Sequence, residues 1–291
     1  MIYNAEELIL YCKENNKSIA DIVLEDEIKN SGDTEEVIVE KLLNMLEVME
    51  QSAKKFLEVE SVTNLGMIDG FAKKANDYAL KDEGFLSKEN IQAMAMAFST
   101  LEFSSSMGKI VASPTAGSSG IIPAAIFRYK ASNKDVDNRK LVDALLTSVG
   151  IGQIIGRYAN FAGAEGGCQA ECGSASAMAS AALVFLKGGS IEEILNAASI
   201  TLVNILGLVC DPIAGLVEYP CTFRNASGVI NAILSADLAL AGIKSLVPFE
   251  EVTQAMNEVG KSMSYTLKET SLGGLAATKT GEKIKKEFYG E

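Results

Sequence analysis

The sequence contains no histidine. Histidine is the commonest protein ligand of single transition-metal ions and the commonest general base near neutral pH. Its absence excludes histidine-ligated metal sites and imidazole-based proton transfer within this chain. A metal site would have to use other side chains, and thiolates are the soft, electron-donating ligands that suit iron.

Signals for strands and hairpins are also scarce. Few segments alternate apolar and polar residues with period two, and the Asn-Gly dipeptide is absent. Only 7% of the residues are aromatic, although 48% are hydrophobic, so small and flexible side chains dominate the apolar content. We predict an all-α fold, a single compact multi-helix domain over residues 1–291 with cysteine-bearing loops.

Apolar residues recur at helical spacing through most of the chain. A short helical start is expected within residues 1–30, with residues 5–12 apolar on one face. The other expected helices cover residues 34–58, 87–108, 121–129, 140–159, 174–187, 190–209, 226–246 and 249–267. Residues 61–86 have no clear period. Residues 198–217 are apolar enough to suggest a membrane span, but they include Asn204 and Asp211. A buried helix that runs into a loop is the better interpretation.

The formal net charge is −12, with a sequence pI of about 4.7. An acidic surface repels phosphate backbones, so we expect no nucleic-acid partner. The basic run 279–286 is expected to be a solvated face. No basic segment followed by an apolar stretch opens the chain, so we expect no signal peptide, no membrane association and a cytoplasmic location.

Four of the five cysteines lie in two glycine-rich, nearly uncharged segments, residues 166–173 and 210–221. They are Cys168, Cys172, Cys210 and Cys221. In a reducing compartment, clustered thiols indicate a metal ion or an iron–sulfur cluster rather than disulfides. A structural zinc site and plain buried thiols are the alternatives, although neither segment has the short CxxC spacing of zinc ribbons. Cys12, isolated in a helical stripe, is expected to be a buried thiol.

Four segments together resemble the α chain of the iron–sulfur-dependent L-serine dehydratases of the two-subunit type. They are residues 113–120 (SPTAGSSG), 167–171 (GCQAE), 210–221 (CDPIAGLVEYPC) and 273–276 (GGLA). The similarity covers about residues 20–280. It implies a pyridoxal-phosphate-independent ammonia-lyase that converts L-serine to pyruvate and ammonia, in amino-acid catabolism and gluconeogenesis. It also implies a separate β chain as partner in a hetero-oligomer.

The resemblance also implies site residues. A [4Fe–4S] cluster would be held by Cys168, Cys210 and Cys221, with Cys172 as a possible further ligand, and its open iron would act as a Lewis acid. The substrate would be bound by the loop residues Ser113, Thr115, Gly117, Ser118 and Ser119.

The general base stays unknown. Lys109 and Lys268 are weak candidates, and Glu171, Glu218 and Lys279 are conceivable. Asn160, Gln169 and Arg224 could orient substrate, although a structural role is expected for each. Two other functions remain open: a non-catalytic zinc- or cluster-binding scaffold subunit, and a cluster-dependent hydratase of a hydroxy acid. A pyridoxal-phosphate enzyme is disfavoured because its fold would need strands.

Overall fold

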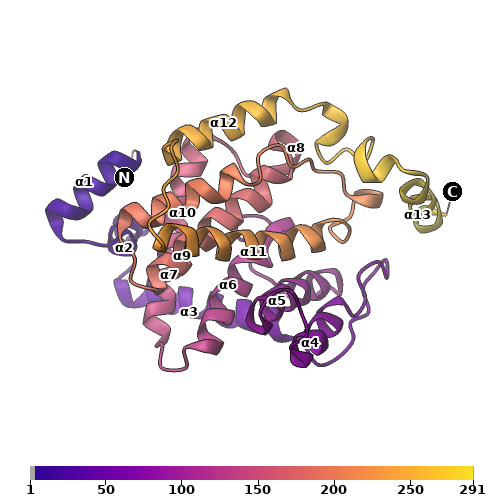
Figure 1. The fold of residues 1–291 in the computed structure, drawn as a ribbon, viewed down its shortest axis with the longest axis horizontal. Coiled ribbons are helices and arrows are strands. Elements are labelled where there is room, and N and C mark those ends of the chain that lie inside the picture. The colour runs from indigo at the N-terminus through magenta and orange to yellow at the C-terminus, as the bar shows by residue number, and fades with distance from the viewer. Residues whose placement is uncertain (1–3, 291) are drawn as a thin grey trace.

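The computed structural model describes residues 4–290, and helix α9 (Ser174–Leu186) runs through their middle (Figure 1). It packs against α6 (Ile121–Ser132), α7 (Asn138–Tyr158), α10 (Ile191–Val203) and α11 (Cys221–Leu240). Most of the buried residues of α9 are alanine or serine. Small side chains let four helices approach one central helix closely, which explains the low aromatic content.

The remaining helices cover this centre. They are α1 (Ala5–Asn15), α2 (Ile19–Ser31), α3 (Glu35–Lys54), α4 (Phe71–Lys81), α5 (Lys88–Ser105), the short α8 (Gly163–Gly166), α12 (Phe249–Ser262) and α13 (Lys279–Tyr289). The N-terminal helices lie at one end of the molecule and α13 lies at the other (Figure 1). Helix α5 packs against α3, α4, α6 and α11, and so ties the N-terminal half to the centre.

Helix starts follow the sequence signals. Ser18 and Ser190 each form a capping box with the acidic residue three positions later, and Asp137 accepts a 2.7 Å hydrogen bond from the backbone N–H of Lys140. Such caps pair backbone donors that a helix cannot satisfy itself, and each is typically worth about 1 kcal/mol.

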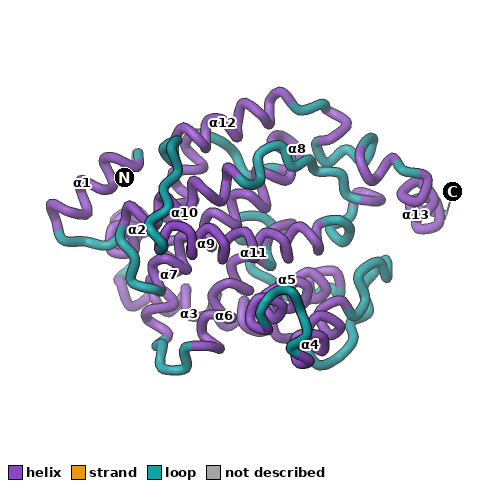
Figure 2. The backbone as a smooth tube through the Cα atoms, viewed as in Figure 1, coloured by secondary structure: helices purple, strands orange, loops and turns teal. Residues whose placement is uncertain are grey.

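The all-α prediction is confirmed. Residues 4–290 contain no strand, only an isolated parallel bridge between Cys210 and Lys268 (Figure 2). Across the same residues, no helix has both the length and the apolar character needed to cross a membrane. The apolar stretch 198–217 is the end of α10 followed by loop, as expected.

Several predicted boundaries were wrong. Helix α4 was missed because its sequence is rich in charged residues and only Ala72 and Ala79 of it are buried. Helix α10 ends at Val203 instead of residue 209, shortly before Gly207, whose φ of 87° is left-handed. Helix α11 starts at Cys221, five residues before the predicted 226, and this error matters for the site. Helix α12 ends at Ser262 instead of 267.

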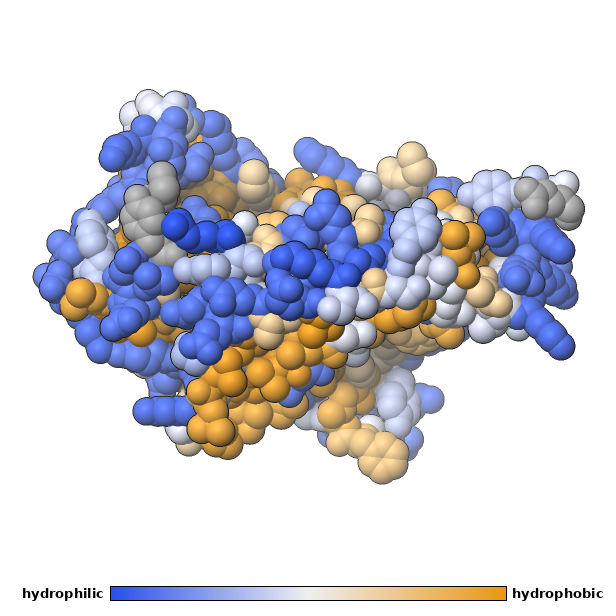
Figure 3. All heavy atoms as spheres, turned by 90° about the horizontal axis from the view of Figure 1, so that it is seen from above, coloured by the Kyte–Doolittle hydropathy of each residue, from blue (hydrophilic) through white to orange (hydrophobic). Residues whose placement is uncertain are grey.

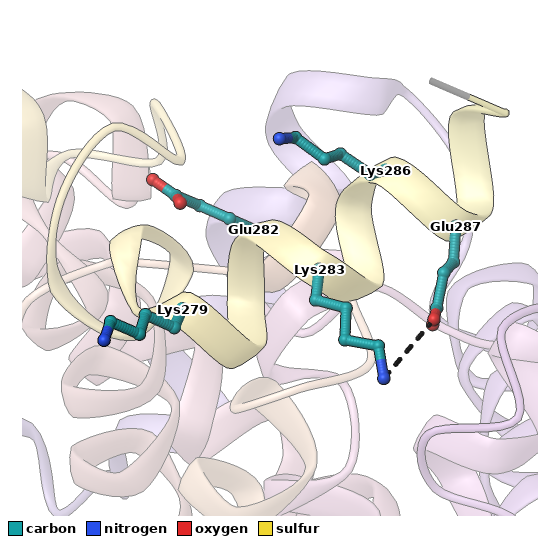
Figure 4. A pocket seen from close by; sticks show the side chains of 5 residues that line it. All are labelled: Lys279, Glu282, Lys283, Lys286 and Glu287. Atoms are coloured by element: carbon teal, nitrogen blue, oxygen red, sulfur yellow. Dashed lines mark ion pairs between the residues drawn. The ribbon is translucent and has the colours of Figure 1, made fainter.

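The basic run 279–286 forms most of helix α13, with its charged side chains in solvent (Figure 4). Lys283 and Glu287 form an exposed ion pair of 3.6 Å. The expectation of a solvated face is confirmed. The wider surface is likewise largely hydrophilic on the face seen in Figure 3, with a hydrophobic area along one edge.

Candidate active site

The four clustered cysteines are all buried free thiols. Cys168 precedes a short π-helical segment, η2 (Gln169–Gly173), which carries Cys172. Cys210 lies in the extended bridge, where its backbone N–H donates to Leu267 O at 2.9 Å. Cys221 is the first residue of α11. Three separate backbone conformations thus bring two distant segments of sequence together.

The four thiols shift one another's pKa values. The thiol of Cys172 hydrogen-bonds to Cys168 and lowers its pKa, while the same interaction and burial raise the pKa of Cys172. Burial, followed by the charge of Cys168, raises the pKa values of both Cys210 and Cys221. One thiolate is therefore favoured in a group of four, and a bound cation would be needed to ionise the others.

The donor set fits an iron–sulfur cluster by its chemistry. Within residues 4–290, Cys, Asp and Glu side chains form no group of three or more placed to hold a metal ion. A four-iron cluster is a larger group held by separated thiolates. Four buried thiols beside a guanidinium with an unpaired N–H offer ligands and positive charge to such an anionic group.

The serine-rich loop lies against the first cysteine segment. Thr115 donates a 2.8 Å hydrogen bond to Oε1 of Glu171, and the Sγ of Cys172 lies 4.0 Å from Gly117 O. A Cβ at Gly117 would lie 3.2 Å from the same carboxylate, so glycine permits the close approach. The other oxygen of Glu171 lies 3.9 Å from Cys210 Sγ. Burial raises the pKa of Glu171.

Most polar groups of this loop are already paired. Ser118 hydrogen-bonds to Thr115, and Ser119 donates to Ala116 O at 2.8 Å. Ser113 differs, because its Oγ is buried without a hydrogen-bond partner. The structure thus brings the predicted loop to the cysteines but leaves only Ser113 among its buried hydroxyls with unused hydrogen-bonding capacity.

Asn225 fixes the loop to helix α11. Its amide nitrogen donates to Gly117 O at 2.7 Å and Cys221 O at 2.8 Å, and its oxygen accepts from Gly120 N at 2.9 Å. The side chain is fully buried. One amide therefore holds the loop and the helix that begins with a cysteine in a fixed relation.

A buried ion pair completes the surroundings of the thiols. Arg224 Nη2 binds Asp211 Oδ1, and Asp211 Oδ2 accepts a 2.6 Å hydrogen bond from Leu275 N in the 3₁₀ turn η5 (Gly274–Ala277). Burial lowers the pKa of Arg224, but the charges of Cys168 and Asp211 outweigh it and the pKa is raised. The Gly-Gly-Leu-Ala turn thus holds Asp211, and Asp211 in turn holds the guanidinium of Arg224.

Other candidates lie in structural or exposed positions. Glu218 accepts hydrogen bonds from the backbone of Leu65 at 3.1 Å and Met67 at 3.3 Å, which anchors the 63–67 loop. The amide of Gln169 bonds only to backbone groups. Lys109 and Lys279 are exposed. The half-buried Lys268 lines an open polar pocket together with Asn160.

Sequence reasoning missed Asn225 and gave Asp211 no role. The signal was present in the spacing, since Cys221, Arg224 and Asn225 stand at i, i+3 and i+4. They share a helix face only if the helix begins at Cys221. Placing its start at residue 226 hid that face.

Comparison with known proteins places the chain in a family. Residues 14–276 match the family model described as serine dehydratase alpha chain. This chain belongs to that family. It is 60% identical over 292 residues to the L-serine dehydratase alpha chain of Peptoniphilus asaccharolyticus, with 100% of this chain and 99% of the relative covered. A protein of Bacillus subtilis, named a probable L-serine dehydratase alpha chain, is 42% identical over 100% of this chain and 96% of its own length.

Longer relatives also exist in the family. The L-serine dehydratase of Streptomyces coelicolor is 36% identical over 278 residues, which cover 93% of this chain but 60% of the relative. The Escherichia coli L-serine dehydratase TdcG is 32% identical over 94% of this chain and 61% of its own length. The serine dehydratase α chain is thus one part of these longer proteins.

Proposed function

We propose that this chain is the catalytic α subunit of an iron–sulfur-dependent L-serine dehydratase. The observation that carries the proposal is the meeting of four buried thiols with the loop 113–119 beside a buried guanidinium. The names of the relatives support serine as substrate. A cytoplasmic location is part of the proposal, since thiol ligands need a reducing compartment.

The reaction is a β-elimination. L-Serine loses its Cα proton and its C3 hydroxyl as water, and the resulting aminoacrylate tautomerises to an imine that water hydrolyses to pyruvate and ammonia. Hydroxide is a poor leaving group, and the chemistry that a [4Fe–4S] cluster held by Cys168, Cys210 and Cys221 supplies is Lewis-acid activation of that hydroxyl. Cys172, hydrogen-bonded to Cys168, would position that ligand.

The protein's own groups bind and orient the substrate. Asn225 holds the loop at its place beside the thiols, and Thr115 fixes the Glu171 carboxylate there. Burial of the site excludes water, which strengthens electrostatic interactions with a charged substrate. The proton acceptor for Cα stays open between Lys268, Lys109 and a residue of the partner chain.

A β chain is the proposed partner. The relatives of nearly equal length are named alpha chains, and about 40% of the length of the longer relatives lies outside the region that this chain matches. A separate chain that supplies that remaining portion would make a hetero-oligomer equivalent to the longer proteins.

The deciding experiment is anaerobic reconstitution with iron and sulfide, followed by counts of iron, acid-labile sulfide and zinc. The ammonia and pyruvate released from L-serine are then measured with and without a β chain. About four irons and four sulfides per chain, with serine-dependent pyruvate, are expected. Stoichiometric zinc or no retained iron would overturn the cluster. Iron retention with turnover of a hydroxy acid instead of serine would indicate a hydratase, and retention with neither activity would indicate a scaffold.

A further inference from the structure

We propose that Arg224 binds the α-carboxylate of the amino-acid substrate through its Nη1 group. The inference deepens the proposed function and depends on it. Nothing in the sequence motif separates this arginine from a structural one, so the argument depends on where the structure places its two terminal nitrogens.

The two terminal nitrogens of Arg224 differ in their hydrogen bonding. Nη2 binds the carboxylate of Asp211, whereas Nη1 is buried and has no hydrogen-bond partner. The residue is only 9% exposed. An unpaired buried donor on a charged group is costly, because the desolvation of that group is not repaid. Such a donor is expected where a ligand supplies the missing acceptor.

The guanidinium as a whole lies near the thiols. Arg224 stands between Cys221 and Asn225 on one face of α11, and both neighbours face the site. The charges of Cys168 and Cys221 act directly on the guanidinium. An acceptor that pairs with this guanidinium would therefore lie near the helix face that contacts both the loop and Cys221.

Asp211 holds the guanidinium of Arg224 in place. Asp211 is itself fixed by Leu275 N at 2.6 Å, so the guanidinium can turn away only by breaking its bond to an anchored carboxylate. Arginine offers carboxylates directed, charge-assisted donors. The loop hydroxyls of Ser118 and Ser119 are engaged within the loop, which leaves Arg224 as the buried cation for a carboxylate.

A bound carboxylate needs this charge for chemical reasons. A free carboxylate makes the adjacent Cα proton harder to remove, and a fixed cation offsets that effect in a site that excludes water. Arg224 would thus both select α-carboxylate substrates and ease the proton abstraction. An amino-acid amide has a neutral carboxamide in place of the carboxylate, so its interaction with Arg224 would be much weaker.

The test compares Arg224→Gln and Arg224→Lys with Arg128→Gln on the reconstituted enzyme with its partner chain. Arg128 is a matched control, because its Nε is also buried without a partner but lies on α6 beside Glu89. Calorimetry measures the binding of L-alanine and of L-alaninamide, neither of which has a hydroxyl to eliminate. Iron and sulfide content, circular dichroism and the KM for L-serine are measured in parallel.

We expect wild-type and Arg128→Gln proteins to bind L-alanine about 10- to 100-fold more tightly than L-alaninamide, the range of a hydrogen bond to a charged group. Arg224→Gln is expected to lose that preference, with KM raised by a similar factor and iron content unchanged. Arg224→Lys has one nitrogen for two acceptors, so an intermediate preference is expected. It also carries the test if the glutamine variant fails to fold.

Two results would overturn the proposal. An unchanged preference for the carboxylate in Arg224→Gln or Arg224→Lys excludes the contact. Loss of iron and sulfide from Arg224 variants, with Arg128→Gln intact, shows that Nη1 serves the cluster instead of the substrate. Failure of the proposed function looks different, because wild-type protein then forms no pyruvate, while the calorimetry still decides whether Arg224 binds carboxylate.

Discussion

Thr115 donates a 2.8 Å hydrogen bond to Oε1 of Glu171. This bond joins the serine-rich loop to the segment between Cys168 and Cys172, although Thr115 and Glu171 are 56 positions apart in the sequence. It also places a partly desolvated carboxylate beside Cys210, where burial raises its pKa.

Replacing Thr115 by valine keeps the shape of the side chain and removes its hydroxyl. The half-buried carboxylate of Glu171 then loses a donor, and hydrogen bonds to charged groups are worth about 1.5–3 kcal/mol. We expect the free energy of unfolding of Thr115→Val to fall by about that amount in urea titrations. Thr280→Val, on an exposed position of α13, is the control and should change stability by less than about 0.5 kcal/mol. Equal stabilities would mean that the bond contributes nothing net.

The three proposed cluster ligands can be separated from the fifth cysteine. Cys168→Ser, Cys210→Ser and Cys221→Ser each replace a soft thiolate by a hydroxyl that binds iron poorly. We expect each variant to retain less iron after anaerobic reconstitution and to form little pyruvate from serine, with unchanged circular dichroism.

Cys12→Ser is the matched control for those variants, because Cys12 is also buried but lies in α1. Burial, with a contribution from Asp21, raises its pKa to about 11, as expected of an inert core thiol. Full iron retention is expected in this variant. Iron loss of the same extent in all four variants would point to general unfolding instead of ligation.

Gly274 tests how the C-terminal turn supports the site. Its φ is 61°, and an added Cβ would lie 2.2 Å from Asp211 Oδ2. Gly274→Ala must therefore both strain the backbone and displace the carboxylate that holds Arg224. Gly188→Ala is the control, since its φ of 77° brings the same strain but no atom lies within 4 Å of the new Cβ.

We expect Gly188→Ala to lower the free energy of unfolding by about 1–2 kcal/mol, the cost of a left-handed non-glycine residue. Gly274→Ala should lose more and should also raise the KM for serine. Chemical denaturation and steady-state kinetics measure the two effects. If both variants lose the same stability and keep the wild-type KM, the contact between the turn and Asp211 has no role in the site.

The fold class could be predicted because helical periodicity is a local property of sequence. The central helices α7 and α9 lie near their predicted limits, because a long run of apolar residues is enough to identify a helix from sequence. Helix α4 was not predicted because few of its residues are buried. The start of α11 was predicted too late because Pro220 and Cys221 are typical of loops. The local sequence does not show where a helix begins when contacts with distant parts of the chain determine that position.

The candidate site was predictable in its parts but not in its connections. The motifs located the cysteines and the loop, which the structure brings together. The hydrogen bonds of Asn225 span more than 100 positions, and the support of Arg224 by Asp211 and Leu275 depends on three separate segments. Such pairings are set by packing of the whole chain, so no spacing rule in one sequence reveals them.

A buried carboxyl outside the site predicts how stability depends on pH. Glu102 in α5 is fully buried, its Oε1 accepts a 2.8 Å hydrogen bond from Ala72 N, and its Oε2 has no partner. Burial, with a smaller effect of Asp69, raises its pKa above the ordinary 4.5. Well below pH 4.5 the group is protonated in both the folded and the unfolded chain, and it adds no pH dependence there.

As the pH rises above 4.5, the unfolded chain releases this proton while the folded chain keeps it, so the free energy of unfolding falls. The fall ends at the higher folded pKa and amounts to about 1.4 kcal/mol for each unit of the shift. Glu102→Gln keeps an acceptor for Ala72 N and cannot ionise.

The free energy of unfolding of Glu102→Gln, relative to that of the wild type, should therefore rise as the pH increases from 4.5 to the folded pKa of Glu102. It should stay higher at pH 7. Urea titrations from pH 4 to pH 8 measure the difference, with Glu60→Gln on the exposed surface as the charge-matched control. A difference that is constant with pH would show that Glu102 ionises alike in both states.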